Sequence, residues 1–330
     1  MIAHDIRTSH VLKTDPYFQL QRVITTSGEQ FLVKLPLTDD RGNEEKLLEQ
    51  EFALFSAVGP KYALASLRLA RLDGRLAAFY EAFDGEPLCP RGDAGALELP
   101  EVIDLTGDIC AILAALHAQG TILLGLSPGS FLRSPRGRRL VLADAPFAQP
   151  QGARVDRNEG YWLESPYLPY TAPELLGGAA LPVDHRADLY ALGGLLYHLI
   201  AHRPLFDAVD PAEIINCHLA REPRPLLELA PALPAGVASA VMKLVAKNPL
   251  DRFDSVEAFE QAITDHLDAG RARERSADRE PSGRTGRSPR GRPVALSFTN
   301  RLFGHDDPID LVREKFRGSR SQPAIVFVEG

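Results

Sequence analysis

Cysteine is scarce in this sequence, and the few cysteines follow no recognisable pattern. The 330 residues contain three, Cys89, Cys110 and Cys217, without a CxxC pair or a Cys/His spacing that would bind a metal. The sequence therefore gives no reason to expect a metal centre built on thiols. We expect the three cysteines to be free thiols in the protein core.

Long apolar runs and an excess of positive charge are also missing. The most apolar window, residues 189–201, contains His198 and is shorter than the roughly 18 residues that a membrane span needs. The N-terminal stretch MIAHDIRTSH lacks the apolar core of a signal peptide, and the formal net charge is -7 at pH 7. These absences predict a cytoplasmic protein with no membrane span and no nucleic-acid partner.

The hydrophobic pattern changes between the first third of the chain and the rest. Alternating β-type patterns at 17–24 and 30–35 flank the turn signal TTSGE, and helical spacing follows at 44–58. A hairpin is predicted around DGR, and the later helical segments are 102–117, 187–201, 211–220, 237–246 and 255–267. This division predicts an α+β protein, with a small β-rich lobe at 1–88 and a larger α-helical lobe at 89–268.

A basic segment separates these lobes from the end of the sequence. Between residues 271 and 293, eight arginines accompany three acidic residues, with Gly, Pro and Ser and no large apolar residue. This composition predicts a disordered basic linker, which we place at 269–293. We favour a solvated tether over the alternative, which is a contact with nucleic acid or an anionic membrane.

Three motifs in the second lobe carry a resemblance to a known family. They are YTAPELL at 170–176, HRADLYALGGLLYHLIAHRPLF at 185–206 and KNPLDRFDS at 247–255. Their order and spacing resemble the C-lobe of serine/threonine protein kinases, which implies a two-lobed protein-kinase-like fold. The resemblance also implies that Glu174 pairs with Arg252 and that Asp188 accepts N–H groups of the catalytic loop. The alternative is that all three are surface charges.

The first lobe supplies candidate nucleotide-binding residues through the same resemblance. FLVKL matches the strand that carries the kinase lysine, so Lys34 is the candidate ligand of the ATP phosphates. A solvated lysine on an edge strand is the alternative. Glu51, on the helix that follows, is the candidate ion-pair partner of Lys34, with Glu45 and Glu49 as alternatives on the same helix. AAFYEAFDGEPL resembles the hinge, where adenine would bind backbone groups.

The catalytic loop keeps its apolar frame and loses its charged residues. ILLGLSPGSFL aligns with the family pattern IHRDLKPENIL. Gly125, Ser127 and Ser130 therefore stand where the family has its catalytic Asp, a phosphate-contacting Lys and a magnesium-binding Asn. In LADAPF, Asp144 matches the metal-binding Asp and is the candidate Mg²⁺ ligand, whereas a plain turn acid is the alternative. LKTDPYFQ stands where a glycine-rich phosphate cover is expected, and it contains no glycine to allow close approach to a phosphate.

These losses determine the function that we expect. General-base assistance is worth about 10²–10⁴-fold, and a phosphate contact and a metal ligand are missing as well. The resemblance therefore implies a degenerate, pseudokinase-like regulatory module with weak or no phosphotransfer, in which Lys34, Glu51 and Asp144 would permit weak binding of ATP and Mg²⁺. A scaffold that binds no nucleotide is a further alternative, which the glycine-free LKTDPYFQ supports. The alternative is an active serine/threonine protein kinase, an ATP-dependent transferase with an atypical site. Expected partners are proteins or a downstream domain in cis, and a protein substrate if the domain is active.

The last residues resemble a second family. LFGHDDPIDLVREKFRG followed by PAIVFVEG is similar to the entry of a STAND-type signalling ATPase, with Gly330 as the first glycine of the P-loop. Residues 294–330 are therefore expected to be the start of a truncated ATPase domain that the kinase-like module gates. The order of the parts resembles large bacterial hybrid proteins with sensor histidine kinase modules. We expect the chain to be a fragment of such a protein or a truncated gene product.

Overall fold

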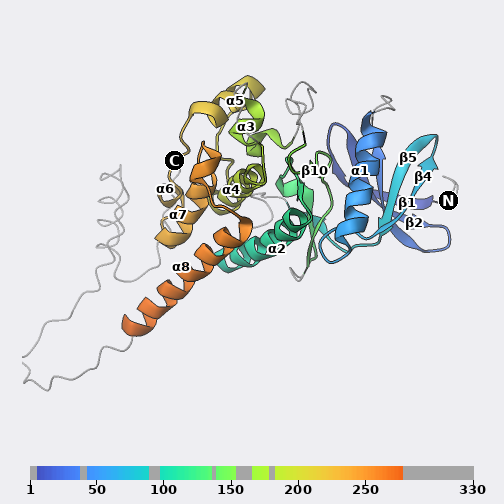
Figure 1. Cartoon of the computed structure of the whole chain (residues 1–330). Coiled ribbons are helices and arrows are strands. Elements are labelled where there is room, and N and C mark those ends of the chain that lie inside the picture. Colours follow the sequence, from blue (N-terminus) through green and yellow to red (C-terminus); the bar gives the residue numbers. More distant parts are fainter. Residues whose placement is uncertain are drawn as a thin grey trace, which may run out of the picture. The chain divides into compact units, whose positions relative to one another are not determined.

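The computed structural model describes residues 6–37, 43–88, 97–135, 139–153, 166–177 and 183–277. Within the compact unit Met1–Arg279, a β-rich part is followed by a helical part (Figure 1). This confirms the predicted α+β, two-lobed architecture. The predicted linker beyond residue 277, the predicted ATPase entry with Gly330, and Cys89 all lie outside the described residues.

A five-stranded antiparallel sheet forms most of the N-terminal lobe, in the order β1-β2-β3-β5-β4. Its strands are β1 (Ile6–Thr14), β2 (Phe18–Thr25), β3 (Gln30–Pro36), β4 (Ser66–Leu72) and β5 (Arg75–Glu81). Successive side chains of a strand point to opposite faces. On the central strand β3, Leu32 joins the main core, whereas Val33 packs into a smaller cluster with Phe79 on the other face.

Helix α1 (Asn43–Val58) covers the sheet face that carries the main core (Figure 1). Phe55 of α1 is fully buried, and its ring centroid lies 5.9 Å from that of Tyr80 on β5. Lys34 is two residues after Leu32 on β3, so its side chain points to this same face, beneath α1. The alternation of the strand thus places a lysine against the covering helix.

The C-terminal lobe is built around helix α4 (Arg186–Ala201), which is buried along most of its length. A capping box of Glu98 and Glu101 begins α2 (Leu99–Ala118). The other helices are α3 (Pro173–Leu176), α5 (Pro211–Ala220), α6 (Leu226–Leu229), α7 (Ala235–Leu244) and α8 (Val256–Ala277). The described ranges also contain the 3₁₀ turns η2 (Pro128–Ser130), η4 (Leu168–Tyr170) and η5 (Pro249–Asp251).

Short strands at the start of the C-terminal lobe place the candidate loop. β6 (Glu86–Pro87), β8 (Phe131–Arg133) and β9 (Leu140–Leu142) form one small sheet, and β7 (Thr121–Ile122) pairs with β10 (Gln149–Pro150). The loop at 123–130 joins β7 to β8. The loop precedes β8 and Asp144 follows β9. Because these two strands are antiparallel neighbours, the loop and Asp144 lie at the same end of this sheet.

Among the differences between the structure and the predicted element pattern, two are the most informative. Strand β1 was not predicted, because most of its side chains are exposed and its sequence IRTSHVLKT lacks a clear apolar alternation. Helix α8 continues to Ala277, although the linker was predicted from residue 269. Residues 271–277, RARERSA, contain mainly good helix formers, and the first proline after them is Pro281. The basic composition therefore does not interrupt the helix.

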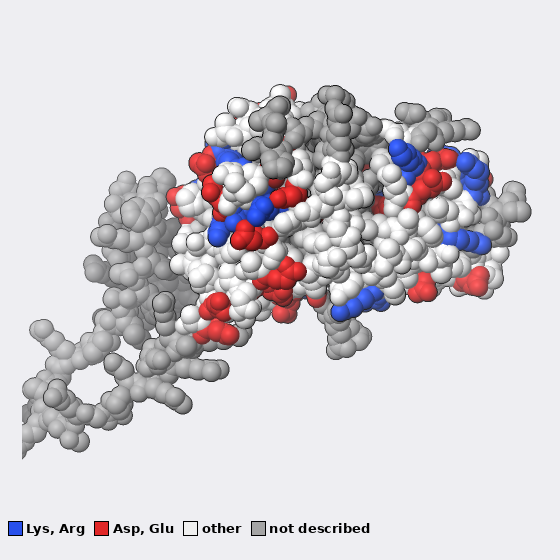
Figure 2. Space-filling model, viewed as in Figure 1, with Lys and Arg blue, Asp and Glu red and all other residues white. Residues whose placement is uncertain are grey.

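None of the helices in the described ranges is long and apolar enough to cross a membrane. On the face shown in Figure 2, acidic and basic side chains are interspersed rather than separated into large areas of one sign. Cys110 and Cys217 are free and buried, as predicted.

Candidate functional site

Lys34, Glu51 and Asp144 come together between the sheet, α1 and the segment after β9. The Lys34 Nζ lies 2.8 Å from Glu51 Oε1 and 2.7 Å from Glu51 Oε2, and it also donates to Asp144 Oδ1. All three side chains are buried. Of the three glutamates considered as partners of Lys34, the structure places Glu51 beside it. Glu45 pairs instead with Arg71, at 2.9 Å.

The charges of this cluster support one another. Burial alone would lower the pKa of Lys34, but Asp144 and Glu51 raise it above its ordinary value. Burial would raise the pKa of Asp144, but Lys13 and Lys34 hold it well below its usual range. Burial raises the pKa of Glu51, and Lys34 offsets part of that effect. Asp144 is therefore an ionised carboxylate held by ammonium groups.

Two residues of the site were missed by sequence reasoning. The Lys13 Nζ, from the end of β1, contacts Asp144 Oδ2 and lies 3.5 Å from Asp15 Oδ2. The buried Tyr167 hydroxyl also donates to Asp144 Oδ2. The signal for Lys13 was its place in LKTDPYFQ, the segment expected to cover the phosphates. The sequence offered no comparable signal for Tyr167, which lies 23 positions from its partner.

The turn between β1 and β2 binds its own backbone. Asp15 Oδ1 accepts the N–H groups of Tyr17, at 2.9 Å, and of Phe18, at 2.8 Å. The buried Phe18 ring lies over the Lys34 ammonium group, with 4.9 Å between Nζ and the ring centroid. In a phosphate-binding loop such N–H groups would point at the ligand. Here a carboxylate accepts two of them, and an aromatic ring lies next to the candidate phosphate-binding lysine.

An aromatic ring packs against Gly125, the residue that the resemblance aligns with the catalytic Asp of kinases. A Cβ atom built on Gly125 would lie 2.6 Å from Cδ2 of Phe147. The Phe147 ring packs edge-to-face against the Tyr167 ring, with 5.5 Å between centroids and 81° between planes. A side chain at residue 125 would therefore require Phe147 to move. The half-buried Phe147 ring therefore occupies the space next to Gly125.

The two serines of the loop bind each other. The Ser127 N–H donates to Ser130 Oγ at 3.1 Å, and the two hydroxyl oxygens are 3.5 Å apart. Both residues are buried. They cap the 3₁₀ turn η2, which makes their role local and structural.

Asp188 holds the backbone just before Gly125. Its carboxylate accepts the N–H groups of Leu123, at 2.9 Å, and Leu124, at 2.8 Å, and lies 2.9 Å from His117 Nε2. Leu124 has a φ of 59°, a left-handed conformation that is unfavourable for a leucine. The buried carboxylate thus stabilises a strained residue. The structure places Asp188 where the sequence analysis expected it, at the backbone of the loop.

Glu174 and Arg252 form a buried bidentate pair. Arg252 Nη1 lies 2.6 Å from Glu174 Oε1, and Nη2 lies 2.8 Å from Oε2. Arg252 also donates to the carbonyl oxygen atoms of Ala246 and Arg186. The geometry matches the fork of a guanidinium on a carboxylate. The pair joins α3 to the segment before α8, away from Lys34.

The donor set does not fit a magnesium ion. Mg²⁺ prefers six oxygen ligands in a nearly octahedral arrangement. Both oxygen atoms of Asp144 already contact Lys13, Lys34 or Tyr167. Ser130 stands where the family has an amide ligand, and its hydroxyl accepts a bond from its own turn. Across the described ranges, no group of three or more His, Cys, Asp and Glu side chains could hold a metal.

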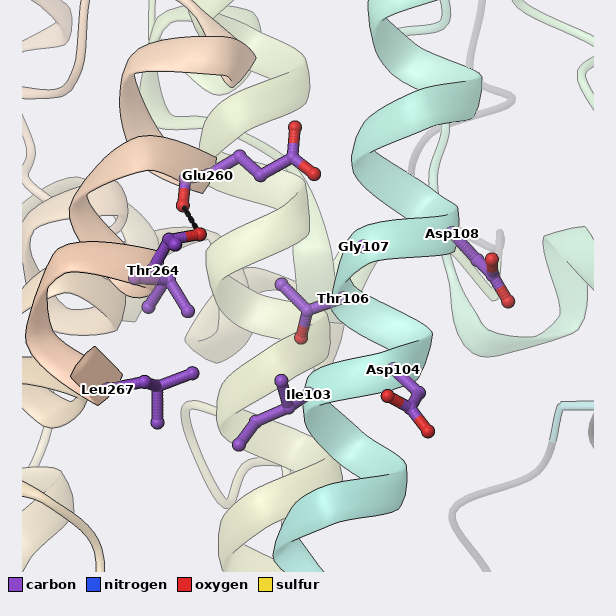
Figure 3. Close-up of a pocket in the computed structure, with 9 residues that line it drawn as sticks. Ile103, Asp104, Thr106, Gly107, Asp108, Glu260, Thr264 and Leu267 are labelled. Carbon is purple, nitrogen blue, oxygen red and sulfur yellow. Dashed lines mark hydrogen bonds between the residues drawn. The ribbon is translucent and has the colours of Figure 1, made fainter. Parts of the chain in front are cut away.

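A separate cavity of about 440 Å³ lies between α2 and α8 (Figure 3). Its lining residues include Ile103, Ile263 and Leu267, and none of the residues described above. The Asp104 and Asp108 side chains point away from α8 (Figure 3). The Thr264 hydroxyl donates to the Glu260 carbonyl of its own helix at 3.0 Å. We therefore locate the candidate functional site at Lys34 and Asp144 rather than in this cavity.

Comparison with known proteins agrees with the fold. No protein-family model matches the chain. The serine/threonine-protein kinase Pkn1 of Myxococcus xanthus is 32% identical over 196 residues, which cover 58% of this chain and 26% of that protein. The serine/threonine-protein kinase PknJ of Mycobacterium bovis is 29% identical over 205 residues, 61% of this chain and 34% of that protein. The chain thus spans about a quarter to a third of the length of these curated relatives.

A longer relative is similar to most of this chain. Histidine protein kinase 1 of Candida albicans is 24% identical over 254 residues, which cover 70% of this chain and 10% of that protein. In that protein, the similar region is therefore a small part of a much longer chain. Three observations agree: the order of sheet and helices, the cluster around Lys34 and the similarity to serine/threonine kinases. Together they show that the chain contains a protein-kinase-like domain.

Proposed function

We propose that this chain is a pseudokinase regulatory module, a protein-kinase-like signalling domain with little or no phosphotransfer. The observation that carries the proposal is the Phe147 ring at the position of the missing base. A Cβ on Gly125 would lie 2.6 Å from that ring, and glycine itself offers no proton acceptor to a substrate hydroxyl. A general base must lie within hydrogen-bonding distance of the proton that it accepts.

The remaining parts of the site support the same proposal. Asp144 is engaged by two ammonium groups and a phenol, and Ser127 and Ser130 are engaged with each other. Two independent losses of about 100-fold each would reduce a typical kinase rate of roughly 1–100 s⁻¹ to below about one turnover per minute. A domain this slow acts by its conformation and its contacts.

The regulated partner is proposed to be a following domain in the same protein. The linker composition and the ATPase-like sequence at 294–330 support this arrangement. The similarity to a small part of histidine protein kinase 1 supports it too, because there the corresponding region belongs to a long chain. ATP, if it enters the cleft, would contact Lys34, whose pairing with Glu51 is intact.

The intact pair also favours a second candidate, an active serine/threonine kinase with an atypical site. Lys34 and Glu51 hold each other at 2.7 Å and 2.8 Å, as an active site of this class requires. This candidate needs a proton acceptor other than Gly125. Asp144, which follows β9 at the same end of the small sheet, already accepts three hydrogen bonds.

A transfer assay separates the two candidates. The full chain is incubated with radiolabelled ATP, Mg²⁺ and a generic protein substrate, beside Lys34→Met as the blank and Lys46→Met, an exposed site on α1, as the control. We expect all three proteins to incorporate label at the same background, below about one turnover per minute. Incorporation by the chain and by Lys46→Met, but not by Lys34→Met, would establish the active kinase instead.

A further inference from the structure

The Lys13 ammonium group lies between two carboxylates. It contacts Asp144 Oδ2 and lies 3.5 Å from Asp15 Oδ2, while the Tyr167 ring centroid is 5.6 Å away. The Tyr167 hydroxyl donates to the same oxygen of Asp144. Two acidic residues thus flank one positive charge at the position where the family binds a divalent cation.

The protein backbone fixes Lys13 in this place. Lys13 is paired with Leu20 in the register of β1 and β2, one residue before the end of β1. Its Cε lies 3.3 Å from the position of a Cβ on Gly129, so the absence of a side chain there gives the lysine stem its room. The Lys13 side chain is only 14% exposed. A strand in one lobe therefore positions the lysine stem, and a glycine in the other leaves room for it beside Asp144.

An ammonium group and a magnesium ion place different demands on Asp144. Lysine supplies three N–H donors and no acceptor, so it cannot serve as a ligand of a metal ion at Asp144. Mg²⁺ needs oxygen ligands at about 2.0–2.1 Å and keeps several water molecules. A magnesium ion bound to Asp144 Oδ2 would take the place of the Lys13 ammonium group, which contacts that same oxygen. Occupation by Lys13 and by a metal ion are thus mutually exclusive.

We infer that Lys13 replaces the divalent cation at Asp144 and is the residue that excludes metal ions and metal-bound nucleotide from the cleft. The inference deepens the proposed function and rests on it, since it explains how a kinase-like cleft stays closed to Mg²⁺-ATP. Lys13 acts as a permanent counter-ion that belongs to the chain. Its removal would leave Asp15, Asp144 and the Tyr167 hydroxyl as oxygen ligands for a metal.

The test uses Mn²⁺ alone as the probe, with free Mn²⁺ measured by electron paramagnetic resonance. The full chain should show no site that depends on Asp144. Lys13→Ala should gain one site, which should bind Mn²⁺ at least about tenfold more tightly than any background binding by the unchanged chain. Adding Asp144→Asn to Lys13→Ala should abolish the gain. Lys13→Arg is the matched control, because it keeps a cation in place and should gain nothing.

Two outcomes would overturn the inference. One is a Mn²⁺ site in the unchanged chain that Asp144→Asn removes, and the other is no gain in Lys13→Ala. If circular dichroism shows that Lys13→Ala does not fold, Lys13→Gln replaces it, since its amide removes the charge and keeps a donor to Asp144. No nucleotide or transfer step enters this measurement. A positive transfer assay would therefore reject the proposed function without deciding the role of Lys13, which the Mn²⁺ result decides separately.

Discussion

At the scale of single residues, Arg252 and Glu174 make a contact that water does not reach. Their side chains are 0% and 1% exposed. Removing one partner of a buried pair leaves the other charge without compensation, which typically costs about 3–5 kcal/mol. We expect Arg252→Ala to lower the free energy of unfolding by about that amount, measured by urea denaturation.

The chain offers a matched control for this change. Arg203 pairs with Asp207 at 2.8 Å, but these side chains are 42% and 75% exposed. A surface pair of this kind contributes about 0–1 kcal/mol, so Arg203→Ala should change the unfolding free energy little. Equal losses in the two variants would show that burial does not determine the contribution of Arg252.

The same scale shows which parts of the candidate site a sequence can predict. Lys34 and Asp144 were found because each lies in a recognisable short motif. The partner of Lys34 could be narrowed only to three glutamates, of which Glu51 is one, since the helical spacing does not give the angle at which α1 meets the sheet. Lys13 and Asp144 are 131 positions apart, and neither residue type demands the other. Such a contact follows from the packing of the lobes and not from any local pattern.

At the scale of elements, two glycines in helices have opposite surroundings. A Cβ on Gly193 of α4 would lie 2.6 Å from Leu244 Cβ and 2.8 Å from a methyl group of Val245. A Cβ on Gly107 of α2 would meet nothing within 4 Å. Gly193 is therefore needed where α4 crosses α7, whereas Gly107 is a helical glycine with free space around it.

This contrast predicts stability changes of opposite sign. Gly107→Ala should raise the free energy of unfolding by up to about 1 kcal/mol, because alanine favours a helix. Gly193→Ala has the same helical advantage, but overpacking should cost about 1–3 kcal/mol and give a net loss. Thermal unfolding of both variants measures the difference. Stabilisation by Gly193→Ala would mean that α4 and α7 move apart at little cost.

The elements themselves were largely predictable, with informative exceptions. The predicted helix at 211–220 agrees with α5, because Asp210 caps it and proline begins it. Strand β1 was missed because an edge strand with mostly exposed side chains has no apolar period. α8 was predicted too short, since basic composition was given more weight than helix propensity. Sequence-based prediction relies on the apolar periodicity that burial of one face produces. Elements that are mostly exposed lack this periodicity and are therefore missed.

At the scale of the whole molecule, a buried histidine makes stability depend on pH. Burial lowers the pKa of His218 to about 3, and the charge of Lys247 acts in the same direction. In the unfolded chain the pKa is about 6.5, so below this pH the unfolded state binds the proton more readily. The contribution of neutral His218 is fully present above about pH 6.5 and is lost as the pH falls toward 3.

We therefore expect His218 to lower the free energy of unfolding by about 2 kcal/mol between about pH 6.5 and pH 5. This follows from a limiting slope of about 1.36 kcal/mol per pH unit for one proton. Urea denaturation across this range gives the slope. His218→Asn can keep an acceptor for the Tyr190 hydroxyl, which now lies 2.8 Å from His218 Nδ1, and should flatten the slope. An unchanged slope in the variant would assign the pH dependence to other groups.

The ring of Phe147 beside Gly125 also bears on how such a domain changes over generations. A base introduced by one substitution at Gly125 would overlap the present position of the ring, so the ring would have to move as well. Shortening Phe147 first would remove a packing partner of Tyr167 before any catalytic benefit exists. The return of a base at residue 125 therefore depends on a second change, in the position or the size of the residue at 147.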